Sequence, residues 1–370
     1  MPKAHFDNLL AAIRPAITVD YMRSSNSTSG NDPIYPEIIL GMGLRFIGLG
    51  SALQDLADLY GMSLPSARRA INAFLDAIDY NTELEELQVR LPDPANREAL
   101  DDLAHRWSSC STAFGLFTHN LGCMDGWFPR TEMPRDVDNQ TDYYSGHYQC
   151  HGLNIQALCD PDLLFLYVAV AAPGKVNDDR AFNRCSGLLD WLEALPSDFY
   201  VIADNAYVLS RRVLVPFDST ELKSEFHRVY NFYLSQLRIR IEMAFGRLTT
   251  KWRILRKILA FYNAKNAKVI RVCTKLHNYC IRMQQRDGGE SGRVGPFWGE
   301  TVNPSHHGIH PLVGEGVNQN SEFGFLETNP ADDPVDPSTL DPDASRRDGI
   351  FADVCSRGLK RPQRNIERNS

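Results

Sequence analysis

The sequence lacks the features that mark membrane and secreted proteins. None of its apolar runs is long enough to span a bilayer. The first seven residues, MPKAHFD, lack the charged start and the apolar stretch of a secretory signal. The eight cysteines form no CxxC pair and no dense framework, which favours reduced thiols in a cytosolic or nuclear protein over a disulfide scaffold. We therefore expect no membrane partner.

Motifs that bind phosphate or present a serine nucleophile are also missing. The chain has no GxxxxGKS or GxxxxGKT loop, no GxGxxG and no GxSxG. Cysteine and histidine gather at two places: His147, Cys150 and His151, and Cys273, His277 and Cys280. The second group shares one helix face, and a lone helix cannot close a tetrahedral zinc site without a fourth ligand. Because neither group has a CxxC or HxxxH partner elsewhere, we interpret both as structural.

The net charge is modest, but its distribution is uneven. The chain as a whole carries −7. Residues 1–204 hold 14 Lys/Arg and 28 Asp/Glu, residues 205–283 hold 16 and 4, and residues 284–370 hold 9 and 14. The middle block is therefore net +12 inside an acidic chain, which is typical of a local site for a polyanion. A solvated helix face is the alternative, and charge alone favours it.

Residues 34–78 have the pattern of helices. Ser63 is a suitable N-cap. Apolar residues follow it at helical spacing: Ile71, Phe74, Leu75 and Ile78. Before this region, residues 24–33 are rich in Ser, Asn and Gly and predict a linker. After it, residues 81–107 are acidic and are expected to be helical, with a break at 92–94.

A short turn within this helical region has a suggestive spacing. Ala57 and Gly61 are four residues apart and are followed by the next helix. In a helix-turn-helix, a small residue permits close packing and a glycine makes the turn. An αα-hairpin in any helical bundle is the alternative. If a helix-turn-helix lies near 54–78, Arg68 and Arg69, which are off the apolar face, would contact DNA.

From about residue 118 the pattern changes to short β-like runs. The predicted strands are 153–158, 163–172 and 199–203. A helical stretch at 179–194 lies between the last two. This order, β and then βαβ, predicts an α/β fold in which helices pack on a mixed sheet.

A second helical region covers residues 231–262. Its apolar residues step by three or four throughout and predict a buried stripe: Leu234, Leu237, Ile241, Phe245, Leu248, Trp252, Leu255 and Leu259. Arg240, Arg247 and Lys251 lie off this stripe. The region could divide into two helices at 249–250.

Residues 284–370 have few clustered apolar residues, and most of this tail is expected to be disordered. Its last fifteen residues contain several cations: Arg357, Lys360, Arg361, Arg364 and Arg368. These could be a nuclear-import signal or a solvated charged end. We therefore predict a helical region at 1–117, an α/β domain at 118–283 and a tail at 284–370.

Four acidic residues stand out by their placement. Asp125 lies between an expected strand and a turn, and Asp204 ends an apolar run. Asp178 begins a helix after a strand, and Glu242 lies beside a core position on the 231–262 helix. Ligands often bind at the carboxyl ends of strands, and carboxylate oxygens suit Mg²⁺ or Mn²⁺. Such acids can hold two metals about 4 Å apart, so that no nucleophilic side chain is needed.

Each of these acids also has a simpler interpretation. Asp125 could be a turn residue, and Asp178 or Asp179 could be the N-cap of the next helix. Asp204 could begin an Asx-turn. Glu242 follows Arg238 by four residues and could simply pair with it. Taken one at a time, the structural role is favoured in every case; the set of four is more telling than its members.

Six segments between residues 122 and 278 form a recognisable series. They are GCMDG (122–126), YSGHYQCHGLNIQA (144–157), AAPGKVNDDRAF (171–182), ADNAY (203–207), RIRIEMAFGRL (238–248) and LHN (276–278). In their order and separation they resemble segments of the PIF/Harbinger transposases and of the nucleases derived from them, within the DDE superfamily. The predicted helix-turn-helix also lies where that family has one.

The resemblance implies an RNase H-like nuclease core at 118–283. Carried over by position, its DDE triad is Asp125, Asp204 and Glu242, with Asp178 as a further metal ligand. The implied reaction is hydrolysis of phosphodiester bonds at element ends, followed by transfer of the freed 3′-OH into target DNA. Both steps are in-line displacements that the same two Mg²⁺ or Mn²⁺ ions can serve.

The resemblance also implies the partners. Double-stranded DNA, as terminal repeats and target site, would be the substrate of a nuclear enzyme. The basic block at 205–283, including Arg240, Arg247 and Lys251, would hold the phosphate backbone beside the metals. The helix-turn-helix would help to read the repeats. A Myb-like accessory protein and a homo-oligomer are partners that the resemblance leaves open.

Two features depart from the family. Trp127 and Phe128 stand where it commonly has a small residue and His; they could stack on an unpaired base or fill the core. The chain also begins close to the helix-turn-helix, so that an upstream helical segment could be missing. A domesticated DNA-binding protein with an inactive nuclease domain is therefore the rival hypothesis. An Mg²⁺-dependent phosphatase-like enzyme fits less well, because it needs neither the helix-turn-helix nor the basic block.

Overall fold

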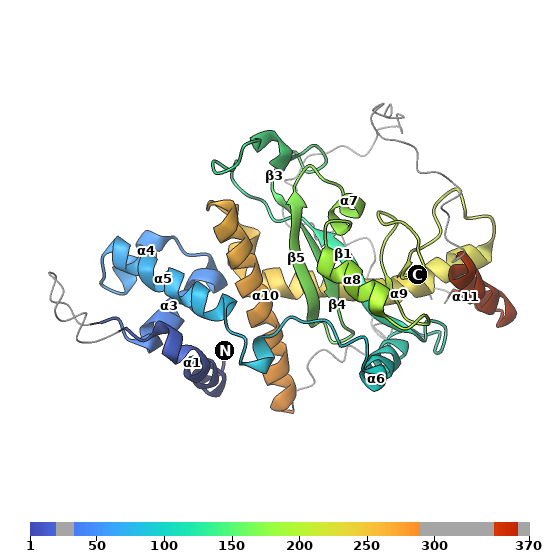
Figure 1. Cartoon of the computed structure of the whole chain (residues 1–370), viewed down its shortest axis with the longest axis horizontal. Coiled ribbons are helices and arrows are strands. Elements are labelled where there is room, and N and C mark those ends of the chain that lie inside the picture. Colours follow the sequence, from blue (N-terminus) through green and yellow to red (C-terminus); the bar gives the residue numbers. More distant parts are fainter. Residues whose placement is uncertain (20–32, 289–343, 362–370) are drawn as a thin grey trace, which may run out of the picture.

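The computed structural model describes residues 1–19, 33–288 and 344–361 (Figure 1). Its helices and strands follow the chain in this order: α1 (Lys3–Ile17), α3 (Pro36–Leu49), α4 (Leu53–Leu59), α5 (Leu64–Asp79), η1 (Glu85–Leu87), α6 (Arg97–Ser108), β1 (Asn120–Trp127), η2 (Gln140–Tyr143), β2 (Tyr144–Ser145), β3 (Cys150–His151), β4 (Leu153–Cys159), β5 (Phe165–Pro173), α7 (Asp178–Phe182), α8 (Ser186–Ala194), β6 (Tyr200–Ile202), β7 (Val213–Leu214), α9 (Glu225–Lys251), η3 (Arg253–Arg256), α10 (Asn263–Arg286) and α11 (Ala344–Ser356). None of the helices in these ranges is both long and apolar enough to cross a membrane.

A mixed sheet of five strands forms the centre of the molecule, in the order β5-β4-β1-β6-β7. The pairs β5–β4 and β4–β1 are antiparallel, whereas β1–β6 and β6–β7 are parallel. Helices α9 and α10 pack against the sheet, and α7 contacts β4 and β5. In Figure 1, α8 lies in front of the strands and α9 passes behind them. The predicted α/β fold with a mixed sheet flanked by helices is confirmed.

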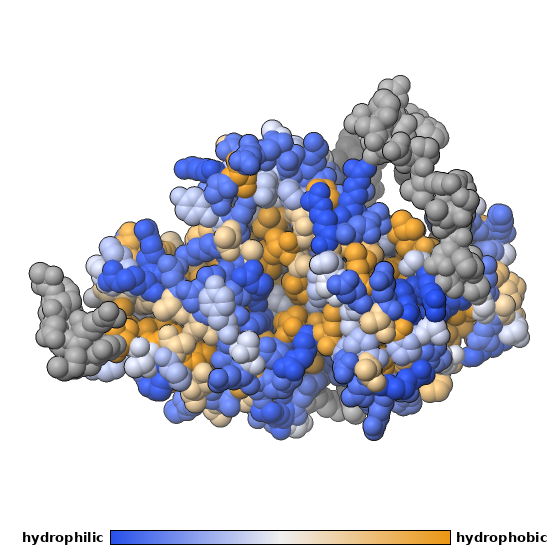
Figure 2. Space-filling view, in the orientation of Figure 1, coloured by the Kyte–Doolittle hydropathy of each residue, from blue (hydrophilic) through white to orange (hydrophobic). Residues whose placement is uncertain are grey.

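The strands formed where the apolar runs predicted them. The runs at 153–158, 163–172 and 199–203 correspond to β4, β5 and β6. The helical stretch at 179–194 is divided into α7 and α8. Strand β5 is an outer strand, and its residues 166–171 are only half-buried. Apolar side chains are accordingly visible over this part of the molecule in Figure 2.

The N-terminal helices α1, α3, α4 and α5 form a group beside α10 (Figure 1). As predicted, the Ser63 side chain caps α5 by accepting a hydrogen bond from the backbone N–H of Ser66 at 3.3 Å. Gly61 lies in the turn between α4 and α5 with a φ of 62°, which favours glycine. A Cβ on Gly43 would lie 2.1 Å from the Phe74 ring, so the glycine allows α3 and α5 to pack closely.

Cations of α10 attach the sheet domain to these N-terminal helices. Lys268 pairs with Asp76, and Arg271 donates to both carboxylate oxygens of Asp79 at 2.9 and 2.6 Å. Lys275 Nζ donates to the last carbonyls of α5, including that of Asp79 at 2.6 Å. Lys268 and Arg271 of the 205–283 block are therefore paired with carboxylates of the protein itself and are not free for a polyanion.

The prediction that 81–107 is helical is only partly correct. Residues 97–107 lie in α6, but the segment before it contains only the short turn η1. The reason is tertiary contact, because α10 takes up the carbonyls of this segment. Arg282 donates to the carbonyls of Glu86 and Gln88 at 3.0 and 2.8 Å, and the Asn278 amide donates to that of Gln88 at 3.0 Å. These bonds replace those that a helix would have made.

Helix α9 is longer at its start than predicted, and it is not divided at 249–250. It begins at Glu225 after a capping box made by Ser224 and His227. Thr249 Oγ1 donates to the Phe245 carbonyl at 2.9 Å within the continuous helix. The chain leaves the helix at Trp252 and enters the turn η3.

The expectation that most of residues 284–370 are disordered stays a prediction, because the structure describes only 284–288 and 344–361 of them, and these are largely helical. Helix α10 continues to Arg286, and α11 packs against α9. The Phe351 ring lies 4.3 Å from the His227 ring, and Arg347 donates to both carboxylate oxygens of Glu221. The rest of the predicted tail lies outside the described residues, as does the predicted linker apart from Pro33 at its end.

Candidate active site

The sheet register places Asp125 and Asp204 side by side. Strands β1 and β6 are parallel neighbours, with Cys123 opposite Ile202. Asp125 follows Cys123 by two residues, and Asp204 follows Ile202 by two residues, just after the end of β6. Asp125 lies inside β1, so its predicted position between a strand and a turn is corrected. Parallel strands end at the same edge of a sheet, which is why two acids far apart in the sequence meet here.

The environment of Asp125 is short of positive charge. Burial raises its pKa to about 7, and the carboxylate of Asp204 raises it as well. Arg238 and the N–H of Gly126, which donates at 2.8 Å, act in the opposite direction. Two neighbouring carboxylates in a half-buried position favour either a proton or a cation between them.

Asp178 joins this pair from α7. The N-cap of α7 is Asn177, so the alternative role of Asp178 as the cap is wrong. Burial raises the pKa of Asp178, and Asp204 raises it too. Asp204 therefore acts on both of the other aspartates. A Cβ on Gly126 would lie 2.1 Å from Asp178 Oδ1, so the carboxylate rests directly on the backbone of β1.

Glu242 is on α9 and is exposed. It pairs with Arg238, with 3.4 Å between Oε1 and the Arg238 nitrogen Nη1, as the simpler interpretation of this residue predicted. Arg238 also lowers the pKa of Asp125, so its charge acts on Asp125 as well as on Glu242. Asp204 also begins the Asx-turn that its simpler interpretation predicted, since its Oδ1 accepts a hydrogen bond from the N–H of Ala206 at 2.9 Å.

The donor set fits a hard divalent cation. Carboxylate oxygens are the ligands that Mg²⁺ and Mn²⁺ prefer, and a cation would supply the charge that Asp125 lacks. In the described ranges, no three His, Cys, Asp or Glu side chains are close enough to hold a metal ion as they stand. His277 is buried and hydrogen-bonds the Leu163 carbonyl at 2.8 Å.

Several side chains of the site were missed by the sequence interpretation. Asn154 and Gln156 contact Asp178, and Tyr207 contacts Gln156. The first two alternate along β4, a strand that is buried at every position. Amides at alternate positions of an otherwise apolar strand need buried partners, and this was the signal available in the sequence.

Trp127 and Phe128 pack within the protein. The Trp127 ring stacks on Phe245 of α9 with 5.8 Å between centroids, and Phe128 stacks on Tyr148 at 4.4 Å. Gly152 leaves room for Phe128, because a Cβ there would lie 2.4 Å from that ring. Of the two interpretations, packing is therefore favoured over stacking on a base.

The predicted DNA-contacting cations differ in exposure. Arg68, Arg69 and Lys251 are exposed, and Arg247 is partly exposed. Arg240 is only 4% exposed and donates to the Pro161 carbonyl at 3.3 Å. A buried guanidinium cannot reach a phosphate backbone, so the prediction for Arg240 is wrong.

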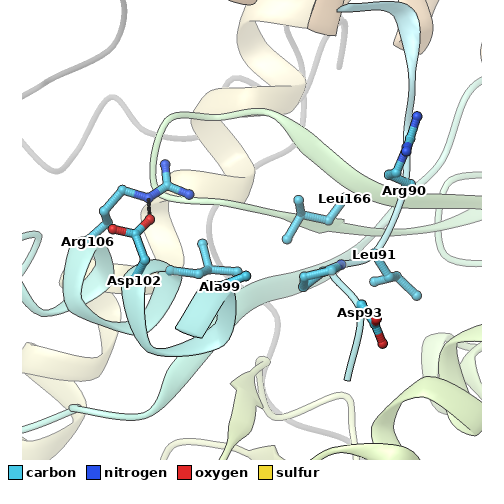
Figure 3. A pocket seen from close by; sticks show the side chains of 9 residues that line it. Arg90, Leu91, Asp93, Ala99, Asp102, Arg106 and Leu166 are labelled. Carbon is cyan, nitrogen blue, oxygen red and sulfur yellow. Dashed lines mark ion pairs between the residues drawn. The ribbon is translucent and has the colours of Figure 1, made fainter. Parts of the chain in front are cut away.

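A pocket of about 510 Å³ lies away from these acids, between α6 and the segment at 90–93 (Figure 3). It contains none of the four candidate carboxylates. Its Arg106 pairs with Asp102, as the dashed line in Figure 3 marks, and with Asp162 at 2.6 Å. Of the charged residues that line this pocket, Arg106 and Asp102 thus pair with each other, and Arg90 pairs with Glu85 outside it.

The family model described as DDE superfamily endonuclease matches residues 124–278. "Protein ALP1-like" of Arabidopsis thaliana is 23% identical over 76% of this chain and 69% of its own length. "Putative nuclease HARBI1" of Rattus norvegicus and of Mus musculus is 23% identical over 70% of this chain and 70% of its own. No solved structure gives a significant match.

All four candidate carboxylates lie inside the matched residues 124–278. Of the six sequence segments that carry the resemblance, five lie entirely within this range, and the first, 122–126, lies mostly within it. Residues 124–278 are therefore similar to the DDE superfamily endonucleases, and the chain is similar to proteins named as ALP1-like and as a putative nuclease.

Proposed function

We propose that the chain is a divalent-metal-dependent DNA endonuclease of the Harbinger type, which cuts phosphodiester bonds at element ends and transfers the freed strands. The observation that carries this proposal is the placement of Asp125 in β1 and of Asp204 two residues after the neighbouring parallel strand β6, where Asp204 raises the pKa of both Asp125 and Asp178. The relation to nucleases of transposase origin supplies the reaction class.

In this proposal Asp125, Asp204, Asp178 and Glu242 hold the Mg²⁺ or Mn²⁺ ions. Such an ion supplies an activated water and offsets the charge that develops on the leaving oxygen. Glu242 has to leave Arg238 to reach the ions, because the two side chains are paired. Arg238 then becomes available for a phosphate of the bound DNA.

The remaining parts of the proposal concern architecture and partners. The antiparallel β5-β4-β1 strands followed by parallel β6 and β7 support an RNase H-like core. Helices α4 and α5 support a helix-turn-helix near 54–78. We also propose a helical region at 1–117, a nuclease domain at 118–283 and a tail at 284–370. The proposed substrate is double-stranded DNA, and the proposed location is the nucleus. A Myb-like accessory protein and a second copy of the chain are the further partners that the proposal leaves open.

The second candidate is a domesticated DNA-binding protein with an inactive nuclease domain. The observation in its favour is the pairing of Glu242 with Arg238, which holds the fourth acid away from a cation. The two candidates differ in whether the acids cut DNA and agree that the chain binds it.

Metal removal distinguishes the two candidates. We expect the full chain to nick duplex DNA in Mn²⁺ or Mg²⁺, to stop when EDTA is added and to resume when Mn²⁺ is restored. DNA binding, measured by a mobility shift in the same buffers, should persist in EDTA. Nicking that continues in EDTA would contradict the metal assignment. Binding with no nicking in any metal would favour the second candidate.

The helix-turn-helix proposal gives a separate prediction. Arg68→Ala/Arg69→Ala should weaken duplex binding, because both side chains are exposed at the start of α5. If each contacts a phosphate, the slope of log affinity against log salt should fall by about 0.9 for each side chain. Arg14→Ala is the control, since this exposed arginine pairs with Glu37. Equal affinities of variant and wild type across a salt series would rule out this DNA-contact surface.

A further inference from the structure

A chain of buried polar side chains leads from Tyr207 to Asp178. The Tyr207 hydroxyl donates to Gln156 Oε1 at 2.6 Å. The Gln156 amide nitrogen donates to Asn154 Oδ1 at 2.8 Å and to Asp178 Oδ1 at 3.2 Å. The Asn154 nitrogen donates to Asp178 Oδ1 at 2.9 Å and to the Val176 carbonyl at 3.0 Å. Four side chains from three segments are thus joined.

The direction of each bond is fixed by its neighbours. A tyrosine hydroxyl has one proton, and a carboxylate can only accept. Turning the Gln156 amide over would bring its oxygen against the Asp178 carboxylate, so only one orientation satisfies both ends. Tyr207, Gln156 and Asn154 are 4%, 0% and 7% exposed. Water therefore cannot readily replace a missing partner, and the loss of one bond disturbs the others.

The slot that receives the carboxylate is formed by two strands. Gly126 of β1 stands directly opposite Gln156 of β4 in the sheet register. A Cβ on Gly126 would lie 2.1 Å from Asp178 Oδ1, so only glycine leaves room there. The carboxylate is therefore held from one side by the β1 backbone and from the other by the two amides.

The two oxygens of Asp178 are not equivalent. Both amide bonds go to Oδ1. Among the described residues, Oδ2 accepts no hydrogen bond. A carboxylate whose one oxygen is fixed by amides presents the other in a set direction, which is the arrangement that partners of a metal ligand create.

We propose that Asn154, Gln156 and Tyr207 are positioning residues that orient Asp178 so that its Oδ2 faces a divalent cation. The proposal rests on the proposed function, in which Asp178 is one of the metal ligands. Tyr207 follows Asp204 by three residues, so the same loop after β6 that carries one ligand also orients another. Changes to these residues should therefore alter metal affinity.

The test is Mn²⁺ binding to the full chain, followed by the EPR signal of free Mn²⁺. Tyr207→Phe removes the single proton that fixes Gln156 and keeps the ring. We expect the Mn²⁺ dissociation constant to rise about tenfold or more, while nicking recovers at saturating Mn²⁺. Tyr200→Phe is the matched control, because Tyr200 is equally buried on β6 and its hydroxyl has no partner among the described residues. This control should bind Mn²⁺ as the wild type does.

A double-variant comparison separates positioning from a general packing role. If Tyr207 acts through Asp178, Tyr207→Phe should add nothing to Asp178→Asn. Gln156→Met removes the amide that donates to Asp178 and Asn154 and keeps a side chain of similar length. It should weaken Mn²⁺ binding as Tyr207→Phe does, and it replaces Tyr207→Phe as the test if that variant does not fold. Full additivity of the two changes would overturn the positioning role. If Asp178→Asn weakens Mn²⁺ binding but neither Tyr207→Phe nor Gln156→Met does, only the positioning role is overturned and the proposed function stands. No effect of Asp178→Asn would overturn both this role and the metal assignment of Asp178.

Discussion

Asp204→Asn should abolish metal-dependent nicking and leave DNA binding intact. Asp204 is the carboxylate that acts on both Asp125 and Asp178, so it holds the central position in the candidate site. Removing a ligand at that position should cost several kcal/mol of transition-state stabilisation, or a rate loss on the order of 10³-fold.

The fold should tolerate this change. Asp204 Oδ1 accepts a hydrogen bond from the N–H of Ala206 at 2.9 Å. An asparagine oxygen can accept the same bond, so the turn after β6 is kept. The variant thus removes the charge with little change in shape.

The measurement is the rate of nicking in Mn²⁺, with affinity for the same duplex determined in parallel. Asp179→Asn is the matched control, because Asp179 is the neighbour of Asp178 in the first turn of α7 but takes no part in the candidate site. Nicking by Asp204→Asn at the wild-type rate would mean that the site is not where we place it. Loss of DNA binding together with nicking would indicate misfolding.

The sequence predicted the parts of the site that depend on strands. An apolar run that ends in an acid places that acid at the edge of a sheet, and this was correct for Asp204. Asp125 lies inside its strand, because Gly126, which the sequence interpretation took as the start of a turn, is itself part of β1. Pairing β1 with β6 in parallel then required the tertiary structure.

Helical periodicity was less informative, because it says which residues share a face and not what that face meets. Arg240 is off the apolar stripe of α9, yet the Pro161 segment covers it. Lys268 and Arg271 were counted toward a polyanion site, yet they pair with Asp76 and Asp79. Both errors arise from partners that are far away in the sequence. The net charge of a segment does not reveal such partners, because it carries no information on tertiary contacts.

Asp125→Asn should make the metal-free protein more stable above neutral pH. The folded pKa of Asp125 is about 7, whereas its ordinary value is 3.8. Because the folded pKa is the higher one, the folded state loses stability as the pH rises from about 4 to about 7. The penalty is fully present above that range. The difference of about three units corresponds to at most about 4 kcal/mol, and asparagine removes it because it carries no charge.

Thermal unfolding in EDTA at a series of pH values measures this effect. The Tm of Asp125→Asn should exceed that of the wild type by several degrees at pH 8, and the gap should close by pH 4. Asp190→Asn, which changes an exposed acid on α8, should show no such trend. Mn²⁺ should raise the wild-type Tm at pH 8 more than that of the variant, since the cation supplies the missing countercharge. A gap in Tm that is independent of pH would show that Asp125 is not destabilised by burial beside Asp204, and the electrostatic basis for a cation site would then be lost.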